Sequence, residues 1–221
     1  MTSKLIIFDL DDTLIDTFGS LVMNQTEKVF EKLLKAGLKA ERSMLERFKK
    51  INRSSVSGKE AIRKFLAELG QENFLEIGLK EYYENNEVNV PVSQMKGATR
   101  VLTQLKENNY LVLVTYGLEE QQYKKMYSAG INKNWFSKIL FVDQRNKKRE
   151  YARLRQEFGI GVKNIVVCGD RYETDLIPAK ELGMKTIHVC WGRGKISVPK
   201  EGEVDYIVTD LREIIKIVND F

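Results

Sequence analysis

Three carboxylates near the N-terminus are the residues of this sequence best suited to do chemistry. Asp9, Asp11 and Asp12 directly follow the apolar run Leu5–Phe8, which is typical of a buried strand. Carboxylates at this spacing repel one another unless a cation lies between them or one of them is protonated. A hard divalent ion such as Mg²⁺ takes oxygen ligands and would relieve the repulsion. The pattern therefore indicates a metal-assisted site, with a simple turn at 11–13 as the alternative.

A second acidic pair follows another apolar run later in the chain. Asp170 comes directly after 166–169, and Asp175 lies about one helical turn further on. Asp170 or Thr174 could instead cap a helix. Capping alone does not explain why acids of the type that metals need follow two separate strands.

Two weaker signals could serve a phosphoryl group. Thr115 ends the apolar run 111–114 and is followed by Tyr116 and Gly117. A hydroxyl and backbone N–H groups at a strand end can donate to an oxyanion, although Thr115 could also cap the next helix. A lysine, either Lys147 or Lys148, precedes a helical pattern and could neutralise a phosphoryl group as a point charge.

The elements that must position these residues alternate along the chain. Continuous apolar segments predict parallel strands that are covered on both faces, at 4–9, 111–115, 138–143, 164–169, 185–190 and 205–208. Helical patterns lie between them at 94–108, 118–130, 148–158 and 173–182. This alternation predicts an α/β fold with a doubly wound parallel sheet, in which ligands bind beyond the carboxyl ends of the strands.

The long stretch between the first two strands is different in kind. Residues 19–86 contain no convincing strand, and their apolar residues recur at helical spacing. We therefore expect an α/β core domain formed by 1–15 and 92–221, with a helical domain inserted at 16–91. A bundle inserted directly after the first acidic strand could lie over the site as a cap.

Composition limits the other classes of protein. Of the 221 residues, 43% are hydrophobic and 30% are charged, which is ordinary for a globular protein. No apolar run approaches the ~20 residues of a membrane-spanning helix. The N-terminus does not resemble a signal peptide, so a cytoplasmic location is expected. Cys168, Cys190 and His188 fall in strand-like segments and are expected to be structural, since their positions are unsuited to a thiolate or imidazole metal site.

The net charge of +5 raises the question of nucleic acid. Most of the charge is interspersed, and the main exception is a basic run. This run forms either a solvated helix face or a local field that attracts an anionic substrate. Its members are Arg145, Lys147, Lys148, Arg149, Arg153 and Arg155.

These motifs resemble those of the haloacid dehalogenase (HAD) superfamily, specifically its Mg²⁺-dependent phosphatases with a helical cap. Residues 9–13 (DLDDT) are similar to the first motif of the family, Asp-x-Asp-x-Thr. Thr115 is similar to the second motif, and Gly169-Asp170 with Asp175 to the fourth. The similarity continues through 96–106, 129–136 and 205–211, so it covers essentially the whole chain with a Rossmann-like core.

The resemblance implies a role for each matching residue. Asp9 would be the nucleophile that takes the phosphoryl group as an aspartyl phosphate, and Asp11 the general acid and base. Mg²⁺ would be held by the carboxylates of Asp9 and Asp170 and by the Asp11 carbonyl, with Asp175 orienting that set from behind. Thr115 and the lysine would hold the phosphoryl oxygens, together with the neighbouring residues Tyr116, Gly117 and Lys148.

Two departures from the family pattern concern the phosphate site. The third motif is often Lys-Pro, but no proline follows Lys147 or Lys148 here. An aromatic residue often lies four positions after this lysine, and counting back from Tyr151 favours Lys147. Tyr116 stands where an asparagine is common.

Several alternatives to a phosphatase remain, some within the family and some from other classes of protein. A 2-haloacid dehalogenase needs no metal, and Asp11 and Asp170 argue against it. A phosphonatase or a sugar-phosphate mutase would differ mainly in the helical domain. A receiver domain would be about half as long, and a nucleic-acid-binding protein is a weaker alternative. The expected partner is a phosphorylated small molecule, which the sequence does not identify further, and the oligomeric state cannot be read from it.

Overall fold

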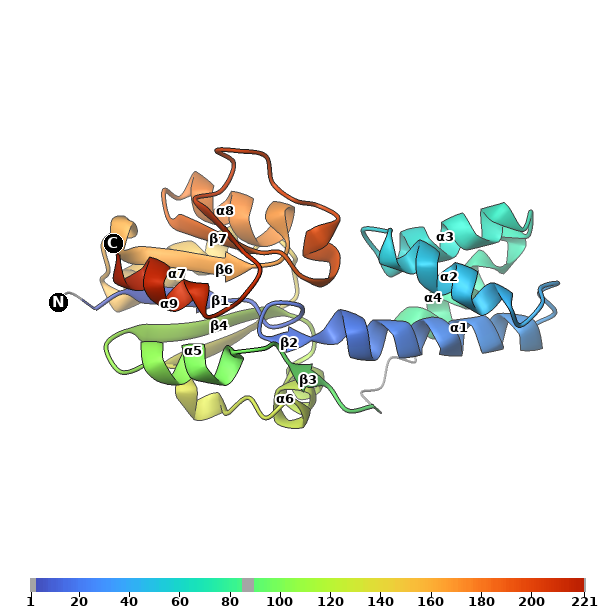
Figure 1. Ribbon diagram of the computed structural model, residues 1–221, viewed down its shortest axis with the longest axis horizontal. Helices are drawn as coiled ribbons and strands as arrows, with labels where there is room; N and C mark the ends of the chain where they lie inside the picture. Colours follow the sequence, from blue (N-terminus) through green and yellow to red (C-terminus); the bar gives the residue numbers. More distant parts are fainter. Residues whose placement is uncertain (1–2, 85–89, 221) are drawn as a thin grey trace. The chain divides into compact units, whose positions relative to one another are not determined.

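The computed structural model describes residues 3–84 and 90–220. The chain divides into two compact units, which are described separately below and are labelled by element in Figure 1. The first, the α/β unit, combines Met1–Asp16 with Val92–Phe221. The second, the helical unit, is the continuous segment Thr17–Pro91. The role of the helical unit as a cap stays a prediction.

A parallel sheet forms the centre of the α/β unit. Within the described residues it has six strands in the order β5-β4-β1-β6-β7-β8, and every neighbouring pair is parallel. The strands are β1 (Leu5–Phe8), β4 (Tyr110–Tyr116), β5 (Lys138–Val142), β6 (Ile165–Gly169), β7 (Lys185–Val189) and β8 (Tyr206–Val208). This order confirms the predicted doubly wound α/β fold.

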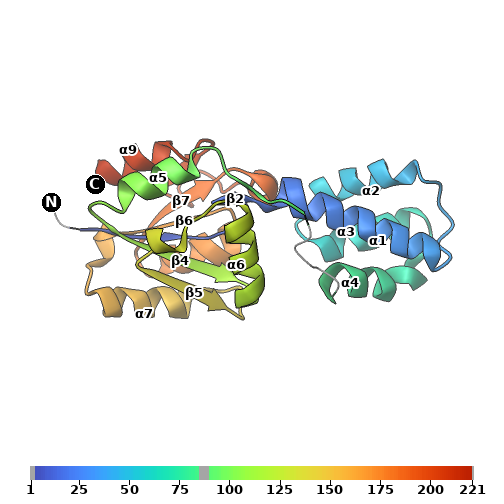
Figure 2. The same cartoon turned by 90° about the horizontal axis from the view of Figure 1, so that it is seen from below.

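Helices cover both faces of this sheet, as Figure 2 shows for α7 on one face and for α5 and α9 on the other. The helices of the unit are α5 (Ala98–Leu105), α6 (Glu119–Ser128), α7 (Lys148–Phe158), α8 (Ile177–Glu181) and α9 (Glu213–Asn219). Because both faces are covered, the central strands need apolar side chains in both directions, and every residue of β1 is fully buried.

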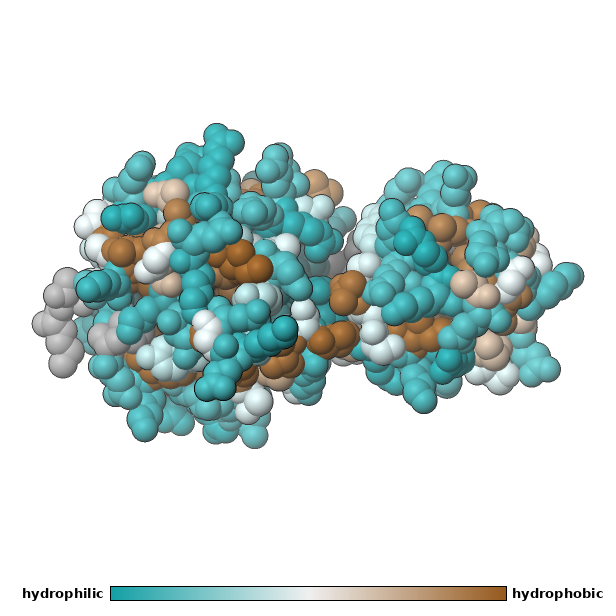
Figure 3. Space-filling view, turned by 90° about the horizontal axis from the view of Figure 1, so that it is seen from above, coloured by the Kyte–Doolittle hydropathy of each residue, from teal (hydrophilic) through white to brown (hydrophobic). Residues whose placement is uncertain are grey.

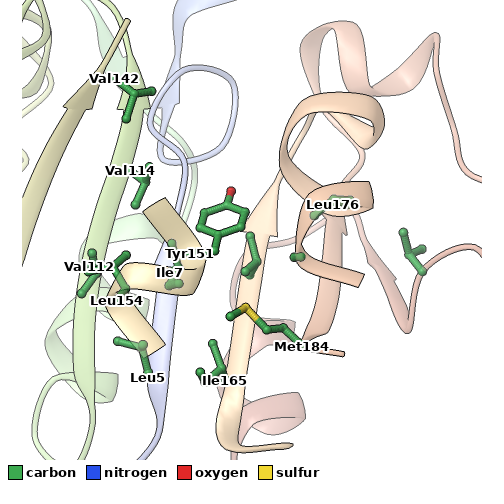
Figure 4. Packing of buried hydrophobic residues seen from close by; sticks show 13 residues of the cluster. Leu5, Ile7, Val112, Val114, Val142, Tyr151, Leu154, Ile165, Leu176 and Met184 are labelled. Atoms are coloured by element: carbon green, nitrogen blue, oxygen red, sulfur yellow. The ribbon is translucent and has the colours of Figure 1, made fainter. Parts of the chain in front are cut away.

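A cluster of buried side chains on one face of the sheet holds α7, which precedes β6, and α8, which follows it. Tyr151 and Leu154 of α7 pack with Leu5 and Ile7 of β1, and Met184 joins the same cluster (Figure 4). Alternate residues of a strand point to one face, which accounts for the spacing of Leu5 and Ile7. Burial of large side chains at about 25 cal/mol per Å² of apolar surface holds α7 in place.

A short antiparallel ribbon closes the α/β unit where the insertion leaves and returns. Strand β2 (Ile15–Asp16) pairs with β3 (Ser93–Gln94), so that Ile15 lies opposite Gln94 and Asp16 opposite Ser93. The sequence analysis did not predict this ribbon, because two-residue strands are too short to show a periodicity.

The helical unit has its own apolar core. Its helices are α1 (Met23–Lys35), α2 (Met44–Arg53), α3 (Gly58–Glu68) and α4 (Leu75–Glu84), and a π-helical turn at Phe18–Val22 precedes α1. Phe48 and Phe65 stack at the centre with ring centroids 4.4 Å apart, and Phe30 meets Phe65 edge-on. The apolar residues that recur at helical spacing in the sequence make up this core.

Both units present mainly hydrophilic residues on the face that Figure 3 shows, with hydrophobic side chains visible between them. Of the helices in the described residues, none is both long enough and apolar enough to cross a membrane.

Candidate active site

Strand register brings the predicted site residues to one edge of the sheet. In β1, Phe8 is paired with Leu113 of β4 and with Cys168 of β6. Because all three strands run in parallel, their carboxyl ends lie side by side. Asp9 directly follows β1, Asp170 directly follows β6, and Thr115 is the penultimate residue of β4.

Three buried carboxylates form the centre of the site. Oxygen atoms of Asp9, Asp170 and Asp175 all lie within 4.8 Å of one another. Neither oxygen of Asp170 accepts a hydrogen bond from the residues that the structure describes, and the Arg171 Nε is 3.4 Å from Oδ2. Buried oxygens without donors are costly unless a cation compensates them. The all-oxygen donor set fits a hard divalent ion such as Mg²⁺.

The electrostatics of this acidic triplet (Asp9, Asp170 and Asp175) agree with its geometry. Burial raises the pKa of Asp170 well above the usual range, and the neighbouring carboxylates, Asp12 first among them, raise it further. Burial also raises the pKa of Asp9, while Lys147 opposes that increase. A positive charge in this position opposes the increase in pKa and favours the ionised carboxylates.

Lys147 supplies such a charge from within the protein. Its Nζ lies 2.6 Å from Asp9 Oδ1 and 2.8 Å from Asp175 Oδ1, and the residue is only 2% exposed. Burial alone would lower the pKa of Lys147, but Asp175 and Asp9 raise it well above the ordinary value. The lysine is held because it directly precedes α7, where the Tyr151 N–H donates to its carbonyl oxygen.

Lys148 lies outside this cluster. Its side chain is half exposed and its Nζ pairs with Glu181 at 2.7 Å. Arg149, Arg153 and Arg155 are also exposed on α7. Of the basic run, the structure thus brings Lys147 to the acidic triplet, while these four residues form a solvated helix face.

Asp11 makes a separate set of contacts. Lys125 Nζ lies 2.9 and 3.0 Å from its two carboxylate oxygens, and Gln122 Nε2 donates to Oδ2 at 3.0 Å. The same Gln122 amide donates to Thr115 Oγ1 at 2.5 Å. The Asp11 carboxylate is therefore placed beside Thr115.

Gln122 and Lys125 were missed by the sequence analysis. They lie three positions apart on α6, the helix that follows Thr115, and residues at this spacing share one helix face. The sequence carries no signal that singles them out, because Gln121 and Lys124 of the same helix are polar residues at the same spacing.

Tyr116 and Gly117 follow Thr115 but have different structural roles, since one side chain is exposed and the other residue forms a turn. The Tyr116 ring is exposed and lies 4.7 Å from the Arg145 guanidinium. Gly117 has a φ of +136°, and a Cβ there would lie 3.4 Å from the Gln122 amide carbon. Glycine is thus required for the turn that brings α6 back toward Thr115.

The turn that the sequence allowed at 11–13 is also present. Asp12 has a φ of +59°, and its N–H donates to the Ile15 carbonyl at 2.8 Å. A loop after β7 packs against this turn, because a Cβ at Gly192 would lie 2.6 Å from the Asp12 side chain. His188 supports the loop through Nε2, 3.0 Å from the Gly194 carbonyl oxygen, and thus has a structural role.

Comparison with known proteins agrees with this geometry. Residues 6–189 match the family model described as haloacid dehalogenase-like hydrolase. The chain belongs to this family. Over 226 residues it is 22% identical to a glyceraldehyde 3-phosphate phosphatase from Pyrococcus furiosus, covering 97% of this chain and 92% of the relative. The resemblance inferred from the motifs is therefore confirmed.

Two solved structures share the fold of the chain. A predicted phosphoglycolate phosphatase from Haemophilus somnus 129pt is 20% identical with a TM-score of 0.72, and 98% of each chain is covered. The HAD-hydrolase YfnB from Bacillus subtilis, which was solved bound to magnesium, is 18% identical with a TM-score of 0.66. That comparison covers 99% of this chain and 100% of YfnB.

Proposed function

We propose that this HAD-like hydrolase is a Mg²⁺-dependent phosphatase that hydrolyses a small-molecule phosphate monoester through an aspartyl phosphate on Asp9. The observation that carries the proposal is the buried arrangement of Asp9 between a fixed ammonium group and two further carboxylates. Lys147 lies 2.6 Å from Asp9, and Asp170 and Asp175 complete the acidic triplet. The magnesium bound to YfnB and the phosphatase relatives support the same assignment.

The first half of the reaction forms the phosphoaspartate. An Asp9 oxygen attacks phosphorus and forms the P–O bond, while the bond between phosphorus and the ester oxygen breaks. Asp11 gives a proton to the leaving oxygen, so that an alcohol departs. Lys147 compensates negative charge beside Asp9, and the Thr115 hydroxyl donates to a phosphoryl oxygen.

The second half restores the enzyme. The Asp11 carboxylate takes a proton from water as the water oxygen bonds to phosphorus and the bond between phosphorus and Asp9 breaks. Asp9, Asp170 and the Asp11 carbonyl would hold Mg²⁺, with Asp175 behind them. When bound, the cation would neutralise charge that develops on the phosphoryl oxygens.

The helical unit is the proposed source of substrate selection. It is inserted directly after the turn that carries Asp11, and it has an independent core. We propose that it acts as a cap that selects the leaving group. Small phosphorylated metabolites, including glyceraldehyde 3-phosphate, are the class to test first.

The function is tested by phosphate release from 4-nitrophenyl phosphate and from a panel of phosphorylated metabolites. We expect turnover with Mg²⁺, loss of turnover with EDTA, and no turnover by a folded Asp9→Asn variant. Turnover that survives EDTA would contradict the metal assignment, and turnover by Asp9→Asn would contradict the nucleophile.

Metal binding has a readout that does not depend on activity. We expect Mg²⁺ to raise the melting temperature of the wild type by mass action, and to leave that of Asp170→Asn unchanged. An equal increase in both proteins would show that the ion binds elsewhere.

A further inference from the structure

We propose that Lys125 and Gln122 are positioning residues that aim the Asp11 carboxyl group at the leaving group. In the acid form of Asp11 the transferred proton is on Oδ1, while Oδ2 still accepts from Lys125 and Gln122. The inference rests on the proposed function, since it concerns how the assigned acid is aimed. Neither residue belongs to the motifs that identify the family in this chain.

Three polar contacts fix the Asp11 side chain from one side. Lys125 Nζ approaches both carboxylate oxygens, at 2.9 and 3.0 Å, and the Gln122 amide donates to Oδ2 at 3.0 Å. The Lys125 side chain is only 13% exposed and that of Asp11 29%, so the pair is partly shielded from water. Charge-assisted hydrogen bonds of this kind are stronger and more directional than those of an exposed pair.

Gln122 connects Asp11 to the proposed phosphate site. Its Nε2 donates to Thr115 Oγ1 at 2.5 Å as well as to Asp11. Because Oγ1 accepts this bond, the hydroxyl proton of Thr115 stays available to donate to a phosphoryl oxygen. A single buried amide thus fixes the distance between the group that holds the phosphoryl oxygen and the group that protonates the ester oxygen.

Helix α6 is well suited to hold both residues still. Gln122 and Met126 are 1% exposed, and the Gln122 N–H donates to the Leu118 carbonyl at 3.0 Å. Lys125 lies on the same helix face as Gln122, one turn further along. General-acid catalysis requires the donor to lie within hydrogen-bond reach of the leaving oxygen. A small displacement of Asp11 therefore lowers the rate of the proton-transfer step.

Two aryl esters separate this role from a general effect on the fold. Phenyl phosphate has a poor leaving group that needs a proton, whereas 4-nitrophenyl phosphate has the same ring and a leaving group that departs without one. For Lys125→Met we expect kcat/KM to fall by roughly tenfold to a hundredfold on phenyl phosphate and by less than about threefold on 4-nitrophenyl phosphate. Gln122→Leu is expected to lower kcat/KM on both esters, and more on phenyl phosphate, because Gln122 also contacts Thr115.

Lys124 provides the matched control on the same helix. Its side chain is 59% exposed and pairs with Glu120 at 2.7 Å. Lys124→Met should leave both esters unaffected, and Lys125→Arg should restore most of the phenyl phosphate activity. In an Asp11→Asn background, Lys125→Met should have no further effect, because its target is absent.

The outcomes distinguish this inference from the function on which it rests. Equal losses on the two esters, or a full effect of Lys125→Met in the Asp11→Asn background, would overturn the positioning role. Wild-type protein that hydrolyses neither ester with Mg²⁺ would instead overturn the proposed function.

Discussion

Lys147 and Lys148 are neighbours in sequence but have opposite environments. Lys147 is buried against Asp9 and Asp175, whereas Lys148 is half exposed and pairs with Glu181. A buried ammonium group acts through a low-dielectric medium, while an exposed pair contributes little. One step in sequence at the start of α7 therefore places Lys147 among the carboxylates and Lys148 at the surface.

We predict that Lys147→Met lowers kcat by about 10²-fold to 10³-fold, comparable with the loss of an oxyanion donor. Lys148→Met should stay within about twofold of wild type, because only a surface ion pair is removed. Phosphate release from 4-nitrophenyl phosphate measures both variants, and circular dichroism checks that each is folded. The reverse order would mean that Lys148 serves the third motif.

Individual site residues were predictable where a polar side chain directly follows an apolar, strand-like run. Asp9, Asp170 and Thr115 could be identified because an apolar run directly precedes each of them. Lys125 could not, because its partner Asp11 is 114 positions away and only the packing of α6 brings them together. The spacing of charges along one helix does not reveal which strand end that helix will face.

At the scale of elements, Gly169 at the end of β6 lets Asp175 of the acidic triplet pack directly against the strand, because glycine has no side chain. A Cβ at this position would lie 2.6 Å from Asp175 Oδ2 and 2.7 Å from Asp175 Cβ. Asp175 is itself buried, so it cannot move away without disturbing Lys147. The end of a strand and the following turn are thus fitted to each other.

We predict that Gly169→Ala lowers the free energy of unfolding by about 1–3 kcal/mol, through overpacking, and also reduces activity. Gly161→Ala is the matched control, because nothing lies within 4 Å of its added Cβ and its φ is −61°. That variant should be unchanged or more stable by up to about 1 kcal/mol. Urea denaturation measures both, and equal stabilities would contradict the close fit at Gly169.

Strands and helices were predicted close to their observed positions where the apolar pattern was continuous. All six strands and the helix at 148–158 were predicted from that pattern. The predicted helix at 173–182 is instead a π-helical turn at Tyr172–Leu176 followed by α8. Pro178 has no N–H to donate to the Thr174 carbonyl, so the regular bond pattern is interrupted there. Helix α9 was not predicted.

At the scale of the whole molecule, the single histidine links stability to pH. His188 is fully buried, and burial lowers its pKa, while the Gly194 carbonyl and the charges of Asp175 and Glu173 partly oppose that decrease. The unfolded chain binds a proton at this residue near pH 6.5, whereas the folded protein resists it. Stability from this residue is therefore present above about pH 6.5 and is lost as pH falls.

We predict that the wild type loses stability relative to His188→Gln between about pH 7 and pH 5, by at most about 1.4 kcal/mol per pH unit. Glutamine can still donate to the Gly194 carbonyl but does not titrate. Tryptophan fluorescence during urea unfolding is the measurement, since Trp135 and Trp191 both lie in the α/β unit. Parallel pH profiles for the two proteins would refute the linkage.

The ribbon formed by β2 and β3 joins the two ends of the inserted helical unit. Its pairing of Asp16 with Ser93 places the start and the finish of a 75-residue excursion, Thr17–Pro91, at adjacent points of the backbone. A hairpin turn of a few residues could replace the whole excursion without altering the strands that carry the carboxylates. An insertion whose ends are adjacent in this way can be lengthened, exchanged or removed without moving the strands of the parallel sheet.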